Sequence, residues 1–217
     1  MKTLDKRLEH HIDLLLVRYP ALCEIRDDII NAYLLLEECY ENGGKLLIAG
    51  NGGSAADAEH IAGELMKSFR KKRPVSSEFA EKLKSVDPVR GAFLAEKLEC
   101  TLTAIPLTAH EALSTAYLND ADATGVFAQQ LFGLGRKGDV FLGISTSGNS
   151  VNIMKAAVVA KASDIKIIGF TGKGGGELAG IADIAVKVPE TETYMIQELH
   201  LPIYHCWCQM LEDKFFG

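Results

Sequence analysis

The 217-residue sequence has little that could bind an anionic polymer or enter a membrane. It carries 23 Lys and Arg residues against 29 Asp and Glu residues, for a formal net charge of −6. This balance argues against nucleic acid or an anionic membrane as the main partner. No apolar run reaches membrane-spanning length, and early charged residues predict no signal peptide. The acidic charge does not exclude a small anionic ligand, because local backbone dipoles can bind it without net positive charge.

Cysteine is also scarce, and its distribution is irregular. The five cysteines are Cys23, Cys39, Cys100, Cys206 and Cys208. An odd, scattered set does not suit a disulfide framework, so we expect free thiols and a cytoplasmic protein. Cys206 and Cys208 would point to nearly opposite sides of a helix, which favours buried thiols over a metal site.

What is present is typical of a soluble globular domain. Hydrophobic residues make up 47% of the chain and charged residues 24%. A chain of this length can bury a core without disulfides or structural metals. We find no long-period repeat and no low-complexity segment. The sequence therefore predicts one domain over residues 1–217.

Short apolar runs alternate with helical patterns along most of the chain. The expected strands are 45–50, 102–107, 139–144, 165–171 and 184–188. The expected helices are 54–68, 109–135, 149–163, 175–182 and 193–216. This order predicts an α/β fold, a five-stranded parallel sheet flanked by helices in a three-layer sandwich. In such sheets ligands bind outside the carboxyl ends of the strands.

Two segments extend this scheme. Residues 1–42 read as two N-terminal helices separated by Pro20, with apolar residues at helical spacing in each. Residues 70–100 read as a helical insertion between the first and second strands. Its basic start at 70–73 is expected to be a solvated face rather than a ligand site.

Loops rich in Gly and Ser follow three strands, at 51–57, 145–150 and 171–176. Glycine lets backbone N–H groups approach a ligand, and a following helix N-terminus attracts an anion. The 145–150 loop holds four hydroxyl side chains in six residues, more than one helix cap needs. We therefore predict a phosphate site there, and an ordinary turn at 171–176.

A dinucleotide site is the alternative for the first loop. Gly50, Gly52 and Ala55 match a loose G-x-G-x-x-A pattern. The acidic residue that should end the second strand is missing, because that strand closes on Leu107 and Thr108. The sequence also has no Walker A motif, so we reject nucleotide binding.

Two helices carry side chains suited to chemistry. His60 and Glu64 share a helix face, where they can ligate a metal, act as acid and base, or form an exposed hydrogen-bonded pair. Gln197 and His205 lie two turns apart, about 12 Å along a helix axis, and could converge on a group lying between them. His200 falls on another face, so we expect a structural or subunit contact.

These motifs together resemble a known family. Residues 51–64, 119–120, 143–150 and 196–205 are similar to the sugar isomerase (SIS) domain family, most closely its phosphoheptose isomerase branch. The resemblance implies conversion of D-sedoheptulose 7-phosphate to D-glycero-D-manno-heptose 7-phosphate through an enediol, a step toward surface glycans. It also implies a homotetramer whose active sites lie at subunit interfaces.

The resemblance assigns roles to particular residues. Glu64 and His205 match the acid–base pair. Zinc ligands match His60, Glu64, Gln197 and His205. Substrate-binding positions match Asn51, Gly52, Gly53, Ser54, Glu64, Asn119, Asp120, Ser145, Thr146, Ser147, Ser150 and Gln197. A carboxylate base, an imidazole proton shuttle and an electrophile are what ketose–aldose isomerisation requires.

Two departures from the family pattern keep alternatives open. Met195 stands where short family members often carry a charged residue, and the 70–100 segment is longer than theirs. One alternative is a sensor or isomerase of another phosphosugar. Another is a non-catalytic SIS scaffold that binds a protein in replication-initiation control, although retention of the four ligand-type residues speaks against it.

Overall fold

The computed structural model describes residues 3–217 and confirms the α/β prediction. Five parallel strands form one sheet in the order β2-β1-β3-β4-β5. Their bounds are Leu46–Ala49 (β1), Ala104–Pro106 (β2), Val140–Ile144 (β3), Lys166–Thr171 (β4) and Ile184–Lys187 (β5). The chain leaves β1 toward β2 and later returns to the other side of β1 with β3. Strand order therefore reverses between β1 and β3, where open α/β sheets bind ligands.

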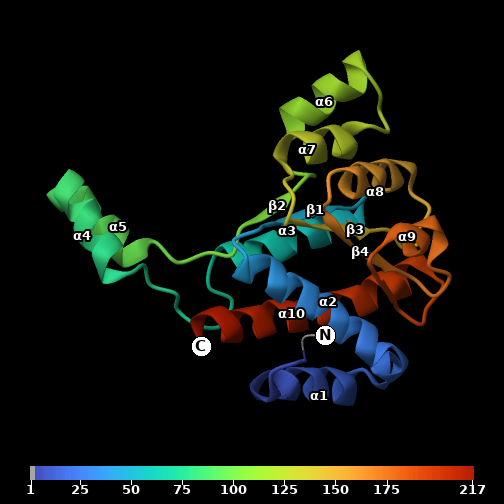
Figure 1. The fold of residues 1–217 in the computed structure, drawn as a ribbon, viewed down its shortest axis with the longest axis horizontal. Coiled ribbons are helices and arrows are strands. Elements are labelled where there is room, and N and C mark those ends of the chain that lie inside the picture. Colours follow the sequence, from blue (N-terminus) through green and yellow to red (C-terminus); the bar gives the residue numbers. More distant parts are fainter. Residues whose placement is uncertain (1–2) are drawn as a thin grey trace.

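Helices cover both faces of the sheet, so the central strands are buried (Figure 1). One apolar cluster packs α1 (Glu9–Arg18), α2 (Arg26–Glu41), α3 (Gly53–Met66) and α10 (Thr193–Phe216) on one face. A second packs α7 (Val126–Leu134), α8 (Val151–Ala162) and α9 (Gly176–Ile181) on the other. None of the helices within residues 3–217 has the length and apolarity needed to span a bilayer.

The N-terminal prediction is confirmed as far as the structure reaches. α1 and α2 are joined by a 3-10 segment, Pro20–Ile25, and another short one, Lys6–Leu8, precedes α1. Residues 1–2 of the predicted 1–42 segment lie outside the described chain. Both helices bury apolar side chains against α10, which fixes them to the body of the molecule.

The single helix expected over 109–135 is wrong. The structure has α6 (Glu111–Asp120) and α7, separated at residues 121–125. The Asp122 carboxylate accepts hydrogen bonds from the Thr124 backbone N–H at 2.6 Å and from Lys155 at 3.2 Å. Such local side-chain bonding competes with the helix and favours a turn, and Gly125 then begins the next helix.

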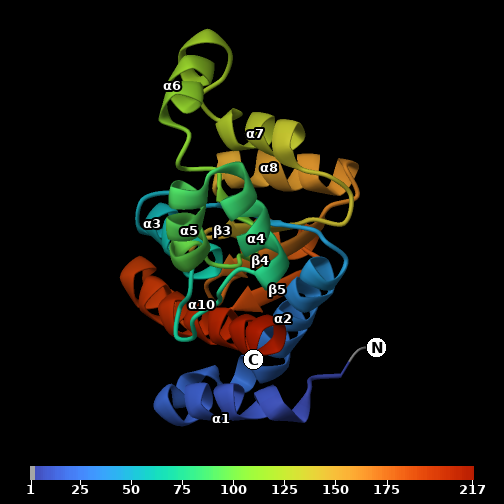
Figure 2. The same cartoon turned by 90° about the vertical axis from the view of Figure 1, so that its left-hand side faces the viewer.

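The predicted insertion is a helical hairpin that projects from the body (Figures 1 and 2). It contains α4 (Ser77–Val86) and α5 (Pro88–Lys97). Ser76 and Asp87 cap the two helices, each accepting backbone N–H groups of the first turn. Within Ser77–Val86, all of it described, no side chain is buried. We call residues 77–97 the arm.

Candidate active site

The first predicted loop lies at the reversal point of the sheet. The amides of Asn51 and Asn152 exchange two hydrogen bonds, at 3.0 and 2.8 Å, and so tie the β1–α3 loop to the start of α8. Gly52 has φ of +57°, a conformation that disfavours other residues. A Cβ on Gly53 would lie 2.6 Å from the Gln197 Nε2, so a larger residue here would displace the Gln197 amide. Ser54 is buried within the first turn of α3.

The predicted phosphate loop follows β3, next to the first loop. Ser145 Oγ and Ser150 Oγ lie 2.9 Å apart, and Ser145 is buried. Ser147 Oγ accepts the Asn149 backbone N–H at 3.2 Å, while Thr146 is half-buried between them. The hydroxyls thus gather ahead of the twelve-residue α8, whose N-terminal N–H groups favour an anion.

The third loop, which we expected to be an ordinary turn, packs against the second. The Gly172 N–H donates to the Thr146 carbonyl at 3.0 Å, and the Thr171 hydroxyl donates to the same oxygen at 3.4 Å. A Cβ on Gly148 would lie 2.0 Å from the Gly175 carbonyl oxygen. The 171–176 segment is therefore a packed support for the serine loop.

The predicted catalytic residues Glu64 and His205 each contact His60 where α3 runs beside α10. His60 Nε2 lies 3.2 Å from Glu64 Oε1 and 3.4 Å from His205 Nε2. The Glu64 side chain is 14% exposed, and its other oxygen receives the Lys67 ammonium at 3.2 Å. α10 continues through Pro202 as one helix of 24 residues. We call the line of contacts from Gly53 and Gln197 to His60 and His205 the α3–α10 seam.

Two residues of this seam were missed from the sequence. The Tyr204 hydroxyl donates to Asp57 Oδ1 at 3.2 Å and lies 2.9 Å from His60 Nδ1. Burial raises the pKa of Tyr204, so its proton is retained. Because the hydroxyl donates its proton to Asp57, Tyr204 can accept a hydrogen bond from a protonated His60 Nδ1 and so orient the imidazole. The signal was the Asp57-x-x-His60 spacing, which puts both on one face of a helix.

The surroundings of His205 favour its neutral form. Burial lowers the pKa of His205, the neighbouring His60 lowers it further, and Glu64 partly opposes both effects. Burial also raises the pKa of Asp57, against the Tyr204 hydrogen bond. A neutral imidazole beside a carboxylate can accept a proton or ligate a metal.

The imidazole and carboxylate groups of the seam are donor types that zinc binds, but only some of their separations fit a zinc site. In a tetrahedral zinc site with bonds of about 2.0–2.2 Å, neighbouring donor atoms lie roughly 3.3 Å apart. The His60–Glu64 and His60–His205 separations match that distance. No hydrogen bond in residues 3–217 joins Gln197 to these three, and its amide rests against Gly53. Glu64 and His205 therefore each contact His60, but the three donor atoms do not all lie within 4.8 Å of one another, so binding one metal ion requires side-chain movement.

Asn119 and Asp120 are not brought to this site within one chain. Both are exposed at the end of α6, and the Asn119 amide donates to Asp120 Oδ1 at 2.8 Å. Among the described residues, neither forms a hydrogen bond to the glycine or serine loops. α6 itself extends away from the body, beyond α7 (Figure 1).

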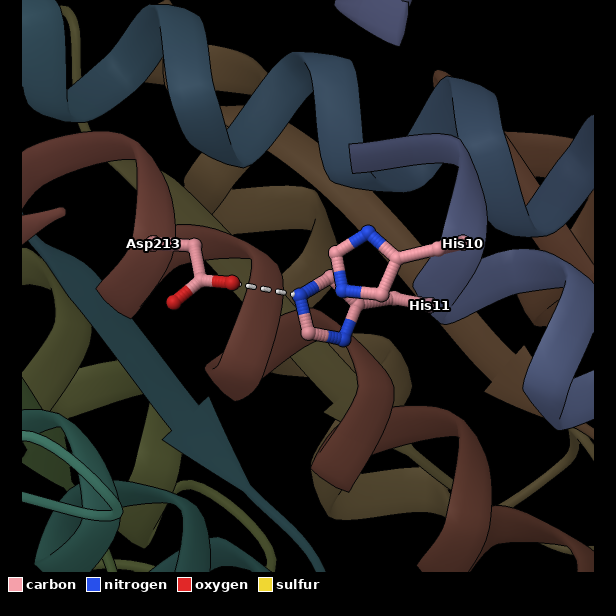
Figure 3. Close-up of side chains that lie close together, drawn as sticks. All are labelled: His10, His11 and Asp213. Atoms are coloured by element: carbon pink, nitrogen blue, oxygen red, sulfur yellow. Dashed lines mark hydrogen bonds and ion pairs between the residues drawn. The ribbon is translucent and has the colours of Figure 1, made fainter. Parts of the chain in front are cut away.

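A second histidine cluster joins α1 to α10 (Figure 3). Among the His, Cys, Asp and Glu residues of 3–217, His10, His11 and Asp213 form the only group of three whose possible ligand atoms all lie within 4.8 Å of one another. His11 Nε2 lies 2.8 Å from Asp213 Oδ2, and the Lys71 ammonium lies 2.6 Å from Oδ1. Because Lys71 already neutralises this carboxylate, we interpret the cluster as an ion-pair network that fastens α1. Sequence patterns did not indicate this cluster, because His11 and Asp213 lie 202 residues apart in the chain.

The remaining expectations concern buried groups. His200 is structural: it is fully buried, stacks on Phe170 at 3.8 Å, and burial lowers its pKa to about 4. Cys206 and Cys208 are free, buried thiols, as predicted. The solvated face expected at 70–73 is right for Arg70 and wrong for Arg73, which is 1% exposed because Glu212 receives its guanidinium.

Comparison with known proteins agrees with this geometry. A family model for the SIS domain matches residues 21–100 and 90–172. Phosphoheptose isomerase 2 of Campylobacter jejuni is 39% identical over 223 residues, covering 100% of this chain and 96% of that protein. The phosphoheptose isomerase of Aneurinibacillus thermoaerophilus is 41% identical over 179 residues, covering 82% and 77%. The solved phosphoheptose isomerase of Neisseria gonorrhoeae superposes with a TM-score of 0.73 at 32% identity, covering 97% of this chain and 100% of its own. The chain therefore belongs to the SIS domain family and, within it, to the phosphoheptose isomerase branch.

Proposed function

We propose that this chain is an aldose–ketose isomerase that converts D-sedoheptulose 7-phosphate to D-glycero-D-manno-heptose 7-phosphate. The observation that carries the proposal is the meeting of Glu64 and His205 around His60, on the seam that starts at the glycine loop. The relatives named as phosphoheptose isomerases support the same substrate. The product would feed the synthesis of activated heptose for surface glycans.

The serine loop would hold the phosphate. Its hydroxyls donate to phosphate oxygens without adding net charge, and the α8 N-terminus supplies a favourable dipole. This explains how a chain of net charge −6 can bind a phosphate monoester. The linked amides of Asn51 and Asn152 would then hold the sugar chain between the two loops.

Glu64 would act as the base at the carbon next to the carbonyl. Its carboxylate is largely shielded from water yet partnered by Lys67 and His60, which keeps it placed. His205, neutral because its pKa is lowered, would take and return the proton of a substrate hydroxyl. Proton transfer through these two groups gives an enediol and then the isomeric carbonyl.

We propose zinc as the resident metal, with His60, Glu64, His205 and Gln197 as its ligands once their side chains rotate toward a common point; a Glu64 or His205 atom that binds zinc would not at the same time take a proton. The imidazole and carboxylate donor types and the two short separations from His60 support this assignment. Bound zinc would polarise the sugar carbonyl. The Tyr204–Asp57 pair would orient His60, as outer hydrogen bonds commonly do for metal-bound imidazole.

We propose a homotetramer in the cytoplasm, with active sites at subunit interfaces. Two observations support association. The arm and α6 expose large apolar side chains, among them Phe93 and Leu118, and such surfaces mark interfaces. Asn119 and Asp120 lie away from the loops of their own chain, so a partner subunit would bring them to a site. The five free cysteines suit a reducing compartment.

The test is a proton NMR time course with sedoheptulose 7-phosphate in D₂O. We expect an aldose anomeric signal to grow and solvent deuterium to enter at carbon 2. The matched control is Glu64→Gln, which keeps the shape of the side chain but removes the base. Absence of product from the zinc-loaded wild-type protein would contradict the proposal and favour another phosphosugar or a scaffold role.

A further inference from the structure

The most enclosed ion pair in residues 3–217 lies at the far end of the α3–α10 seam. The Arg73 side chain is 0% exposed and the Glu212 side chain 1%. Arg73 stands at the base of the insertion and Glu212 stands on α10. The guanidinium Nε and Nη2 lie 2.9 and 2.8 Å from Glu212 Oε1.

Arg73 also holds the end of the helix that carries Glu64. Its Nη2 donates to the Glu64 carbonyl at 3.2 Å, and its Nη1 donates to the Leu65 carbonyl at 3.0 Å. Because α3 ends at Met66, these carbonyls are among the last four, which lack partners within the helix. A cation at a helix C-terminus also opposes the dipole favourably.

Glu212 completes the link from the α10 side. Its two oxygens accept the backbone N–H groups of Phe69, Arg70 and Lys71, at 2.9, 2.8 and 3.2 Å. Despite its burial, these donors and Arg73 lower the pKa of Glu212, so it stays charged. Glu212 lies seven residues, or about two turns, beyond His205 on the same helix.

Stability alone is a poor explanation for this arrangement. Removing two charges from water costs free energy, and apolar pairs of similar volume often stabilise a protein as well or better. What an apolar pair cannot supply is five directed hydrogen bonds to the backbone around Glu64 and the following loop. The ion pair fixes the end of α3 to α10, and therefore fixes the base relative to the proton shuttle.

We propose that Arg73 and Glu212 are positioning residues for the isomerase reaction. They act through the backbone of Glu64 and the α10 helix, and touch neither substrate nor metal. The kinetic part of this inference rests on the proposed function, because misplacing a base by about 1 Å can lower a rate by about a hundredfold. Loss of the pair should therefore lower kcat more than it raises KM.

The test compares the Arg73–Glu212 pair with a second ion pair, Lys45–Asp139, which joins the starts of β1 and β3. There are two test variants. Arg73→Lys keeps the positive charge but loses the several N–H donors of the guanidinium, and the double variant Arg73→Met with Glu212→Gln removes both charges. The control is Lys45→Met with Asp139→Asn, whose ion pair of 2.6 Å lies at the amino ends of β1 and β3, away from the loops. Each variant is assayed below its own melting temperature.

We expect the neutral Arg73/Glu212 pair to lose at least tenfold in kcat, Arg73→Lys to recover part of that loss, and KM to change less than threefold. The control pair should keep kcat within twofold even if its melting temperature falls as far. Wild-type kcat and an unchanged pH profile in both folded test variants would overturn the inference.

A second readout does not depend on turnover. Hydrogen exchange of the peptide spanning residues 60–72 should be faster in the Arg73/Glu212 variants and unchanged in the control. If the wild type isomerises no heptose phosphate, the proposed function fails, but hydrogen exchange still tests whether the Arg73–Glu212 ion pair holds the end of α3. Unchanged exchange in residues 60–72 would overturn the positioning role by itself.

Discussion

The α3–α10 seam and the arm are both helical, yet they are built on opposite principles. Along the seam, side chains of α3 and α10 meet in hydrogen bonds, and the buried Arg73–Glu212 ion pair lies at its far end. In the arm, α4 and α5 pack on each other and leave Phe79, Val86 and Phe93 exposed. The seam joins two helices of the same chain, whereas the arm exposes large apolar side chains. This contrast predicts where substitutions will change activity and where they will not.

The largest effect should come from the base in the seam. Glu64→Gln should lower kcat about a hundredfold or more, since general-base catalysis contributes at that scale, and KM should change little. Steady-state rates with the heptose phosphate measure this. Glu78→Gln, which breaks an exposed ion pair of 2.6 Å in the arm, is the matched control and should keep the wild-type rate. Equal losses of kcat in Glu64→Gln and Glu78→Gln would contradict the distinction between the seam and the arm.

The next effect concerns the buried His200 beside the seam. Its folded pKa of about 4 lies below the ordinary value of 6.5, so the folded state binds fewer protons than the unfolded state. Its contribution to stability is present above pH 6.5 and is lost as the pH falls toward 4, by roughly 3 kcal/mol at most. Urea unfolding of wild type and His200→Gln over this range tests it. An identical pH dependence in both proteins would contradict the assignment.

A smaller effect is expected in the serine loop. Ser150→Ala removes one hydroxyl and leaves Ser145 without its partner at 2.9 Å. One hydrogen bond to a charged group contributes about 1.5–3 kcal/mol, so the affinity for the phosphosugar should fall about tenfold or more. Titration with the substrate measures this, and Ser85→Ala in the arm serves as control. A loss of kcat without a loss of affinity would contradict phosphate binding there.

The smallest effect on folding should come from the arm itself. Phe93→Ser changes a side chain that is 61% exposed, so the free energy of unfolding of the chain should shift by no more than about 0.5 kcal/mol. Association between subunits should weaken instead, which light scattering would detect as a lower molar mass. A large loss of folding stability with unchanged association would show that the arm is covered within its own chain.

The sequence predicted the sheet well because buried parallel strands leave continuous apolar runs. Each expected strand contains an observed one, from Leu46–Ala49 to Ile184–Lys187. It failed at residues 121–125, where the Asp122 side chain ends a helix by a local hydrogen bond that periodicity does not register.

In the candidate site, sequence patterns again missed residues whose roles depend on how the helices pack together. His60, Glu64 and His205 were found from spacing and from family resemblance. The partners that hold them, Tyr204 and Arg73, were not, because their roles depend on which helices lie side by side. Arg73 in particular sits in a basic run that reads as solvated, and only the fold places it against a buried carboxylate.

The central claim is that the serine loop and the α3–α10 seam form one active site. A crystal structure of the Glu64→Gln variant with sedoheptulose 7-phosphate tests it most directly. We predict the phosphate on the Ser145 and Ser150 hydroxyls, with carbons 1 and 2 of the sugar beside residue 64 and His205. A phosphate bound elsewhere, or reacting carbons remote from the seam, would contradict the account.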